Sequence, residues 1–321
     1  MHILITGGAG FLGQRLAQRL LVKPDIQRLT LADVAIPSAL REHSVLSHHS
    51  KVAIAEADLT DPLATNALIS SDVSVVYHLA AVVSGQAEAD FDLGMRVNID
   101  GTRNLLEAVR HQSPGAQFIF ASSLAVFGGD LPSVIDERTV VTPQSSYGTQ
   151  KAIGELLVND YSRKGFVDGR VLRLPTVSVR PGKPNAAASS FVSSIIREPL
   201  QGNSVICPVD DGLPIWLASP NTTAANLAHA LTIQADQFDN SRTINLPGLT
   251  VTVAEMIQAL AQVAGEITVE RIQKQPDAAI SRIVASWPSQ FEVSLARSLG
   301  FAQDDSFEEI IRAFIQEDLA A

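Results

Sequence analysis

Residues 2–21 read HILITGGAGFLGQRLAQRLL, and this stretch decides the fold. A short apolar run leads directly into a glycine-rich turn, which leads into leucines at helical spacing. Glycine lets the main chain turn tightly and approach a ligand, and the free N–H groups at a helix start attract phosphate. The stretch therefore predicts a strand, a phosphate-binding turn and a helix. Two registers of the glycine motif fit: Gly8, Gly10 and Gly13, or Gly7, Gly10 and Gly13.

The same alternation continues beyond this stretch. Short β-branched runs recur with helical patterns between them, which indicates parallel strands joined by crossover helices. The runs at 73–77 and 118–120 are almost continuously apolar, as strands covered on both faces require. We predict an α/β protein with a doubly wound parallel sheet. Its expected strands are residues 2–6, 28–33, 51–55, 73–78, 117–122 and 170–174.

The alternation stops after residue 174, where the loop-rich stretch 175–185 and the small-residue stretch 186–194 follow. We therefore expect a dinucleotide-binding domain over residues 1–177 and a smaller substrate-binding lobe over residues 178–321, with the segment 222–247 returning to the first domain. Within the lobe, Thr252 and Glu255 have the spacing of a capping box. They predict a helix that ends at Gly265.

Composition narrows the classes of partner. The 321 residues carry 24 Lys and Arg against 34 Asp and Glu, a net charge of −10, which argues against nucleic acid. Cys207 is the single cysteine, so we expect no intrachain disulfide, a reducing compartment and a cytoplasmic location. We find no secretory leader and no apolar segment of membrane-spanning length, and expect no membrane association. We expect no metal, since His43, His48 and His49 fall in a polar loop without ligand spacing.

Asp33 ends the second expected strand, roughly 20 residues past the glycine turn. A carboxylate at this place accepts hydrogen bonds from the adenosine ribose hydroxyls, and it repels the 2′-phosphate of NADP. The position therefore favours NAD as the cofactor. The plainer alternative is that Asp33 caps a loop.

Tyr147 and Lys151 lie four residues apart, so on a helix they share one face. An ammonium group beside a phenol stabilises the phenolate and lowers its pKa from about 10, which makes tyrosine a general base. Such a pair also occurs by chance on helix surfaces. Its context favours function, because Ser122 and Ser123 end the preceding strand at the edge where ligands of open α/β sheets bind. Either serine could instead serve only as a turn or a helix cap.

These motifs occur together in one order. As a set they resemble the extended short-chain dehydrogenases, the NAD-dependent epimerase/dehydratase group. The resemblance implies a Rossmann fold, NAD as cofactor and oxidation of a CH–OH group. The motifs that carry it are Gly7-x-x-Gly10-x-x-Gly13, Asp33, Asp58-Leu59, His78-Leu79-Ala80-Ala81, Asn98-x-x-Gly101-Thr102, Ser122-Ser123 and Tyr147-x-x-x-Lys151.

The resemblance also implies roles for individual residues. The segment Val126-Phe127-Gly128 selects Ser123 over Ser122 as the catalytic serine, although Phe127 lacks the hydroxyl often present there. The implied catalytic residues are Ser123, Tyr147, Lys151 and Asn98, the last as part of a hydrated proton relay or as a buried structural residue. The implied cofactor-binding residues are Gly7, Gly10, Phe11, Leu12, Gly13, Asp33, Asp58, Leu59, Leu79, Ala80, Ala81, Asn98, Tyr147, Lys151, Pro175 and Val177.

Two stretches, 81–92 and 175–185, closely resemble a branch of this family that oxidises the four-carbon sugar acid D-erythronate at its C2 hydroxyl. A small anionic substrate needs a cation, and the guanidinium of Arg180 is suited to a carboxylate. Loop cations, however, are often only solvated surface charges. The expected substrate-binding residues are Ser84, Ser123, Tyr147, Arg180 and Lys183.

Two other functions stay open. One is a sugar-nucleotide epimerase or dehydratase with tightly bound NAD, for which Trp216 is the main candidate to stack a base, although a core position is the plainer interpretation. The other is a non-catalytic dinucleotide-binding regulator. The resemblance further implies a homodimer formed by the helices that hold Asn98 and Tyr147. Apolar candidates for its interface are Leu105, Leu106, Leu156 and Leu157.

Overall fold

The computed structural model describes residues 1–182, 187–238 and 241–319. Its centre is a seven-stranded sheet in the order β3-β2-β1-β4-β5-β6-β10, with every neighbouring pair parallel. This confirms the doubly wound α/β fold. The strands are β1 (His2–Thr6), β2 (Arg28–Asp33), β3 (Val52–Glu56), β4 (Val73–His78), β5 (Gln117–Ser123), β6 (Asp168–Leu174) and β10 (Thr243–Asn245).

The six strands expected from sequence are all present, three with the expected ends and three with ends that differ by one or two residues. The third lies one residue later than expected, the fifth extends to Ser123, and the sixth starts at Asp168. The expected loop at 175–185 contains a short strand, β7 (Thr176–Val177), which pairs with a strand of the C-terminal half. A two-residue strand shows no periodicity, so sequence could not reveal it.

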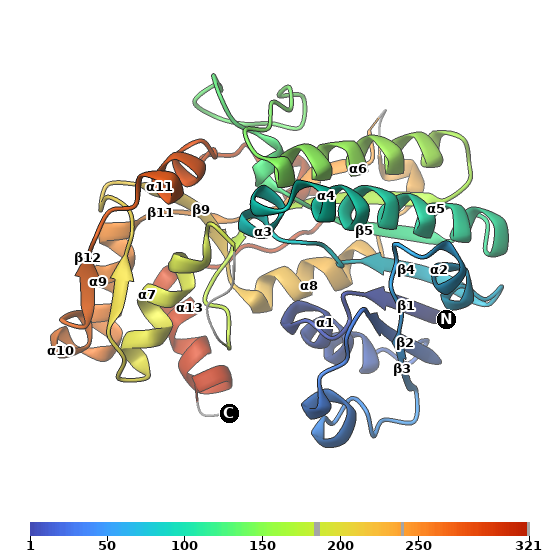
Figure 1. The fold of residues 1–321 in the computed structure, drawn as a ribbon, viewed down its shortest axis with the longest axis horizontal. Helices are drawn as coiled ribbons and strands as arrows, with labels where there is room; N and C mark the ends of the chain where they lie inside the picture. The colour runs from blue at the N-terminus through green and yellow to red at the C-terminus, as the bar shows by residue number, and fades with distance from the viewer. Residues whose placement is uncertain (183–186, 239–240, 320–321) are drawn as a thin grey trace.

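Helices cover both faces of the sheet (Figure 1). Leucines of α1 (Phe11–Leu21) and α8 (Pro220–Ala230) pack on one face. Helices α2 (Pro62–Leu68), α5 (Gly101–Gln112) and α6 (Ser146–Arg163) cover the other. Helix α8 begins two residues before the segment 222–247, and strand β10 lies within it. Strand β10 pairs with β6. This segment therefore lies against the N-terminal sheet.

A chain of short helices leads into α5. These are α3 (Ser84–Ala89), α4 (Phe91–Gly94) and the π-helical turn η2 (Met95–Asp100). Leu105 and Leu106 on α5 are fully buried against the sheet, so the prediction that they contribute to a dimer interface is wrong. Leu157 packs against the same core, whereas Leu156 on α6 is exposed.

The C-terminal half has a second apolar core, which lies to the left of the large sheet in Figure 1. The capping box of α9 is confirmed, since Thr252 Oγ1 accepts from the Glu255 N–H at 3.2 Å and Glu255 Oε2 accepts from the Thr252 N–H at 2.7 Å. The helices here are α7 (Ser190–Leu200), α9 (Val253–Ala264), α10 (Glu266–Val269), α11 (Ala278–Ala285), α12 (Ser294–Ser298) and α13 (Phe307–Phe314), and the strands are β8 (Val205–Cys207), β9 (Pro214–Ala218), β11 (Leu249–Thr252) and β12 (Ile272–Lys274).

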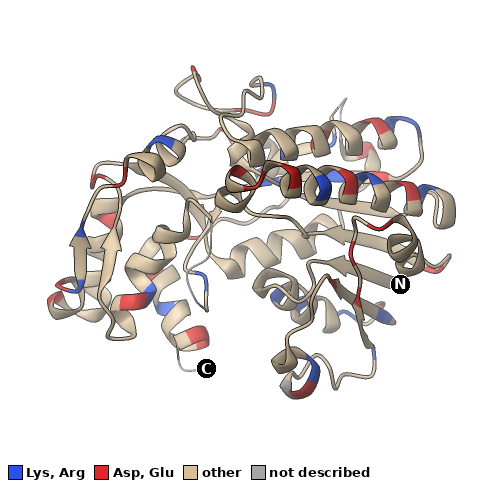
Figure 2. Ribbon diagram, viewed as in Figure 1, with Lys and Arg blue, Asp and Glu red and all other residues tan. Residues whose placement is uncertain are grey.

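Residues of both charge signs occur along α5 and α6 (Figure 2), and the pair at the end of α6, Asp160 and Arg163, is exposed. This is the pattern of a solvated helix face rather than of the basic stripe that nucleic acid requires. Within the described ranges, no helix has the length and apolar character needed to cross a membrane.

Candidate active site

A cavity of about 810 Å³ opens at the carboxyl ends of β1, β4 and β5. The strand order reverses between β1 and β4, and doubly wound sheets bind their ligands at this place. Nearly all the predicted site residues that the structure describes meet here. The cavity wall contains Gly7, Gly10, Phe11, Leu12, Gly13, Asp33, Asp58, Leu59, Leu79, Ala80, Ala81, Ser84, Ser123, Tyr147, Lys151, Pro175, Val177 and Arg180.

The glycine turn forms one end of the cavity. Gly7 has φ +71°, and a Cβ atom on it would lie 2.7 Å from the backbone nitrogen of Ala80, so only glycine fits there. Gly10 is the N-cap of α1, and the first N–H groups of this helix have no partner within it. Gly7, Gly10 and Gly13 line the cavity whereas Gly8 does not, which favours the wider glycine register.

Asp33 lies beside the glycine turn. Its carboxylate accepts hydrogen bonds from the N–H groups of Ala9 at 3.1 Å and Val34 at 2.9 Å. Burial raises the pKa of Asp33, and these two hydrogen bonds oppose the rise. Further along the wall, Leu59 is buried and Asp58 is exposed. The narrow glycine cradle, the free helix start and this carboxylate together fit the phosphates and ribose of a dinucleotide.

Tyr147 and Lys151 both project from the first turns of α6. A Cβ on Gly148 would lie 2.1 Å from the carbonyl oxygen of Ala125, so the glycine lets this helix start close to the end of β5. The phenol of Tyr147 hydrogen-bonds the Ser123 hydroxyl. The Lys151 ammonium lies 5.8 Å from the centre of the Tyr147 ring. The serine, tyrosine and lysine therefore converge, as the sequence predicts.

The electrostatics of the pair are set mainly by burial. Burial raises the pKa of Tyr147 to about 12, opposed by the hydrogen bond from Ser123 and by the charge of Arg180. Burial also lowers the pKa of Lys151 to about 8, opposed by the charge of Glu155. Tyr147 therefore needs further positive charge nearby to ionise at neutral pH.

Ser122 and Ser123 have different surroundings. The Ser122 hydroxyl donates to Glu155 Oε1 at 2.5 Å and is buried. Ser123 Oγ accepts from the Ala125 N–H at 3.2 Å and contacts Tyr147. This arrangement leaves Ser123, rather than Ser122, facing the tyrosine.

Asn98 lies behind the cavity rather than in its wall. Its side chain accepts from the N–H of Val82 at 2.8 Å and donates to the carbonyl of Val82 at 3.0 Å and to Gln150 Oε1 at 2.7 Å. Both amide protons are thereby used. These contacts favour the structural interpretation of Asn98, in which it fixes the loop that follows β4.

The predicted substrate residues that the structure describes, Ser84, Ser123, Tyr147 and Arg180, also line the cavity. Ser84 is the first residue of α3, and its hydroxyl accepts from the Ala188 N–H at 3.0 Å. Within the ranges described, no ion pair forms to the Arg180 guanidinium, and burial lowers its pKa. Arg180 and Tyr147 are close enough for the charge of Arg180 to lower the pKa of the phenol. Lys183 lies outside the described residues.

Sequence reasoning missed several members of the wall. Trp287 and Arg96 both line the cavity, and Trp287 comes from the loop after α11, far along the chain. Trp216 is instead a core residue, since it is buried and stacks on Phe291 with ring centres 5.1 Å apart. No group of three or more His, Cys, Asp or Glu that could hold a metal occurs among the residues described.

Comparison with known proteins agrees with this geometry. The model of the NAD dependent epimerase/dehydratase family matches residues 3–216. The chain belongs to this family. It is 51% identical to D-erythronate dehydrogenase of Cupriavidus necator, over 99% of this chain and 98% of that one, and 50% identical to D-erythronate dehydrogenase of Haemophilus influenzae, over 99% and 100%.

A solved structure has the same fold along the whole chain. It is the crystal structure of an Agrobacterium tumefaciens protein described as a nucleoside-diphosphate-sugar epimerase, with a TM-score of 0.89 and 44% identity. The match covers 100% of this chain and 95% of the other. Its description differs in reaction type from that of the two dehydrogenases.

Proposed function

We propose that this chain is an NAD-dependent dehydrogenase that oxidises D-erythronate at the C2 hydroxyl to 2-dehydro-D-erythronate. The observation that carries the proposal is the meeting of Ser123, Tyr147 and Lys151 in the cavity end that Arg180 also lines. The two dehydrogenases at 51% and 50% identity support the choice of substrate.

The cavity fits NAD, which when bound accepts the hydride from the substrate carbon. Gly7, Gly10 and Gly13, with the start of α1, would hold the phosphates, and Asp33 would accept from the adenosine ribose. Asp58 and Leu59 would border the adenine, while residues 79–81 and the pair Pro175 and Val177 would border the nicotinamide.

The proton of the C2 hydroxyl goes to Tyr147. As phenolate, Tyr147 is the general base, and the Ser123 hydroxyl hydrogen-bonds the substrate oxygen. Lys151 holds the nicotinamide ribose and adds positive charge near the phenol. Further positive charge is required, because burial raises the pKa of Tyr147 to about 12 even though Ser123 and Arg180 oppose the rise.

Arg180 binds the carboxylate of the substrate. Its guanidinium lies near the Tyr147 phenol, forms no ion pair with the residues that the structure describes, and can form a bidentate pair with the C1 carboxylate of a small acid. A carboxylate held beside the base places the adjacent C2 hydroxyl, rather than C3 or C4, within its reach. Ser84 and Lys183 are proposed as further contacts of the hydroxyls and the anion.

The rival function is that of a sugar-nucleotide epimerase, which the Agrobacterium tumefaciens structure suggests. Two observations favour the dehydrogenase. Trp216, the expected base-stacking residue, is buried against Phe291. Phe127 is also fully buried, under the Arg173 guanidinium at 4.7 Å from the ring centre, and does not line the cavity.

We also propose a cytoplasmic homodimer in which the exposed Leu156 on α6 lies at the interface. The single buried Cys207 is compatible with a reducing compartment. Light scattering of the purified protein measures its mass directly, and a monomer at micromolar concentration contradicts the dimer.

A substrate panel tests the reaction. Purified protein with NAD or NADP is offered D- and L-four-carbon sugar acids, hexuronic acids and UDP-sugars, and NADH or NADPH absorbance is followed. We expect the highest kcat/KM with D-erythronate and NAD. No NADH with any sugar acid, or NADH with UDP-sugars alone, contradicts the proposal.

A further inference from the structure

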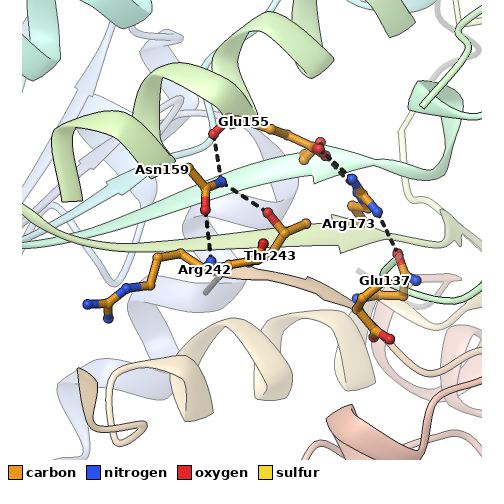
Figure 3. A network of polar contacts seen from close by, with 9 residues as sticks. Glu137, Glu155, Asn159, Arg173, Arg242 and Thr243 are labelled. Carbon is orange, nitrogen blue, oxygen red and sulfur yellow. Dashed lines mark hydrogen bonds and ion pairs between the residues drawn. The ribbon is translucent and has the colours of Figure 1, made fainter. Parts of the chain in front are cut away.

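One face of α6 carries a polar side chain at every fourth position. Tyr147, Lys151, Glu155 and Asn159 have this spacing, and we refer to them as the α6 polar stripe. Each member binds the sheet. Asn159, the last, donates to Thr243 Oγ1 on β10 at 3.1 Å, as Figure 3 shows.

The first three members of the stripe bind consecutive residues at the end of β5. Tyr147 binds Ser123, and Lys151 donates to the carbonyl of residue 121 at 2.8 Å. Between these two contacts, the Ser122 hydroxyl donates to Glu155. The helix therefore has one register against the strand, and a shift by one residue breaks all three contacts.

Glu155 is also held from the neighbouring strand. Arg173 on β6 donates to it through Nε at 2.9 Å and Nη2 at 2.7 Å, a bidentate pair in which both side chains are only 6% exposed (Figure 3). Arg173 lies directly beside Ser122 in the strand register. Because three donors bind the carboxylate, Glu155 is fixed in position.

The charge of Glu155 acts on Lys151, one helical turn away. It opposes the effect of burial and raises the pKa of the ammonium. The other titratable groups around this ammonium are Tyr147 on α6 and His78 on β4, and burial together with the charge of Lys151 keeps His78 neutral, with its pKa lowered to about 3. Arg173, a further charged side chain of this network, is paired with Glu155.

We propose that Glu155 is a positioning residue for the proton-transfer pair: it fixes α6 in register with the end of β5 and supplies the negative charge that faces the Lys151 ammonium. The inference rests on the function proposed above. The reaction needs Lys151 in its charged form, and a buried lysine without a counter-charge loses its proton. Neither the dinucleotide nor the substrate is needed for this effect.

The test separates charge from packing. Glu155→Gln keeps the shape and removes the charge, but it leaves Arg173 unpaired and can unfold the protein. The double variant Glu155→Gln with Arg173→Gln restores a neutral hydrogen-bonded pair. Asn159→Ala is the matched control, because it removes a stripe contact that carries no charge.

Two readouts are compared in each variant. The first is the Lys151 pKa, measured in NAD-free protein from lysine amine resonances by NMR and assigned with Lys151→Met. The second is the pH profile of kcat and KM for D-erythronate oxidation. We expect the double variant to lower the Lys151 pKa by about one unit and to move the alkaline fall of kcat to lower pH by the same amount.

Asn159→Ala is expected to lower the thermal midpoint without shifting the Lys151 pKa. A double variant with the wild-type Lys151 pKa and the wild-type pH profile overturns the proposal, and so does an equal pKa shift in Asn159→Ala. If the wild-type protein makes no NADH from D-erythronate, the proposed function fails, while the NAD-free titration still decides the role of Glu155.

Discussion

The ammonium of Lys151 donates a hydrogen bond to the carbonyl oxygen of Ala121, 2.8 Å away, and so ties the start of α6 to the end of β5. The same lysine lies 5.8 Å from the centre of the Tyr147 ring. A backbone carbonyl cannot change rotamer, so the contact holds the lysine and, through the helix, the tyrosine.

Tyr147→Phe removes the proposed base and leaves the cavity shape intact. We expect kcat to fall by roughly 100- to 10,000-fold, the range typical of a lost general base. The dissociation constant for NAD is expected to stay within about twofold, because the phenol supplies little binding energy compared with the phosphate cradle. Steady-state kinetics and NAD titration by fluorescence measure the two quantities; activity close to wild type means that another group is the base.

Asp33→Ala removes the carboxylate that we assign to the adenosine ribose. Hydrogen bonds to a charged group contribute about 1.5–3 kcal/mol, so the KM for NAD should rise by about 10- to 150-fold with kcat little changed. Asp58→Ala, at an exposed position on the same wall, is the control and should have a smaller effect. An unchanged KM for NAD in Asp33→Ala rejects its ribose role.

Arg180→Met tests the carboxylate contact. Loss of a charge-assisted bidentate pair should raise the KM for D-erythronate by about 10- to 150-fold, again from about 1.5–3 kcal/mol, and leave the KM for NAD unchanged. The methyl ester of D-erythronate lacks the anion, so wild type and Arg180→Met should have similar KM values for it. If the variant loses as much activity on the ester as on the acid, Arg180 does not bind the carboxylate.

His78 links stability to pH. Thr102 Oγ1 donates to the Asn98 carbonyl at 2.7 Å, so it accepts from His78 Nε2 at 2.9 Å, and His78 Nδ1 accepts from Thr6 Oγ1 at 2.7 Å. This buried chain requires neutral histidine, and burial lowers the pKa of His78 to about 3. As the pH falls below about 6.5, His78 binds a proton in the unfolded chain but stays neutral in the folded chain.

The folded state should therefore lose about 1.4 kcal/mol per pH unit through His78 on acidification from about 6.5 towards 3. His78→Gln keeps donor and acceptor capacity but does not titrate, so its free energy of unfolding should fall less steeply over this range. Urea unfolding at a series of pH values measures both slopes. Equal slopes in the two proteins mean that His78 is not the group involved.

Much of the fold could be predicted from the sequence because its signals are local. The apolar runs of the buried strands, the glycine turn and the capping box of α9 each depend on residues a few positions apart. The partners across the sheet could not be predicted in this way. Glu155 lies four residues past Lys151 in the sequence, but its role depends on Arg173, which only strand pairing brings beside it.

Helix faces show the same limit. Leu105 and Leu106 are adjacent apolar residues, and the sequence alone does not say which surface they cover; both pack against the sheet. Asn98 matches the family motif, whereas its bonds to Val82 and Gln150 appear only in three dimensions. Trp287 reaches the cavity from the C-terminal half, so no local pattern marks it.

The central claim is net oxidation at C2, and the most direct measurement is the stoichiometry and identity of the product. Purified protein is incubated with D-erythronate and excess NAD, NADH is quantified by absorbance, and the product is trapped with o-phenylenediamine, which forms a quinoxalinol only with a 2-oxo acid. We predict one NADH per D-erythronate consumed and one equivalent of the trapped 2-oxo acid. NADH without the trapped product, or conversion of the substrate without NADH, contradicts the account.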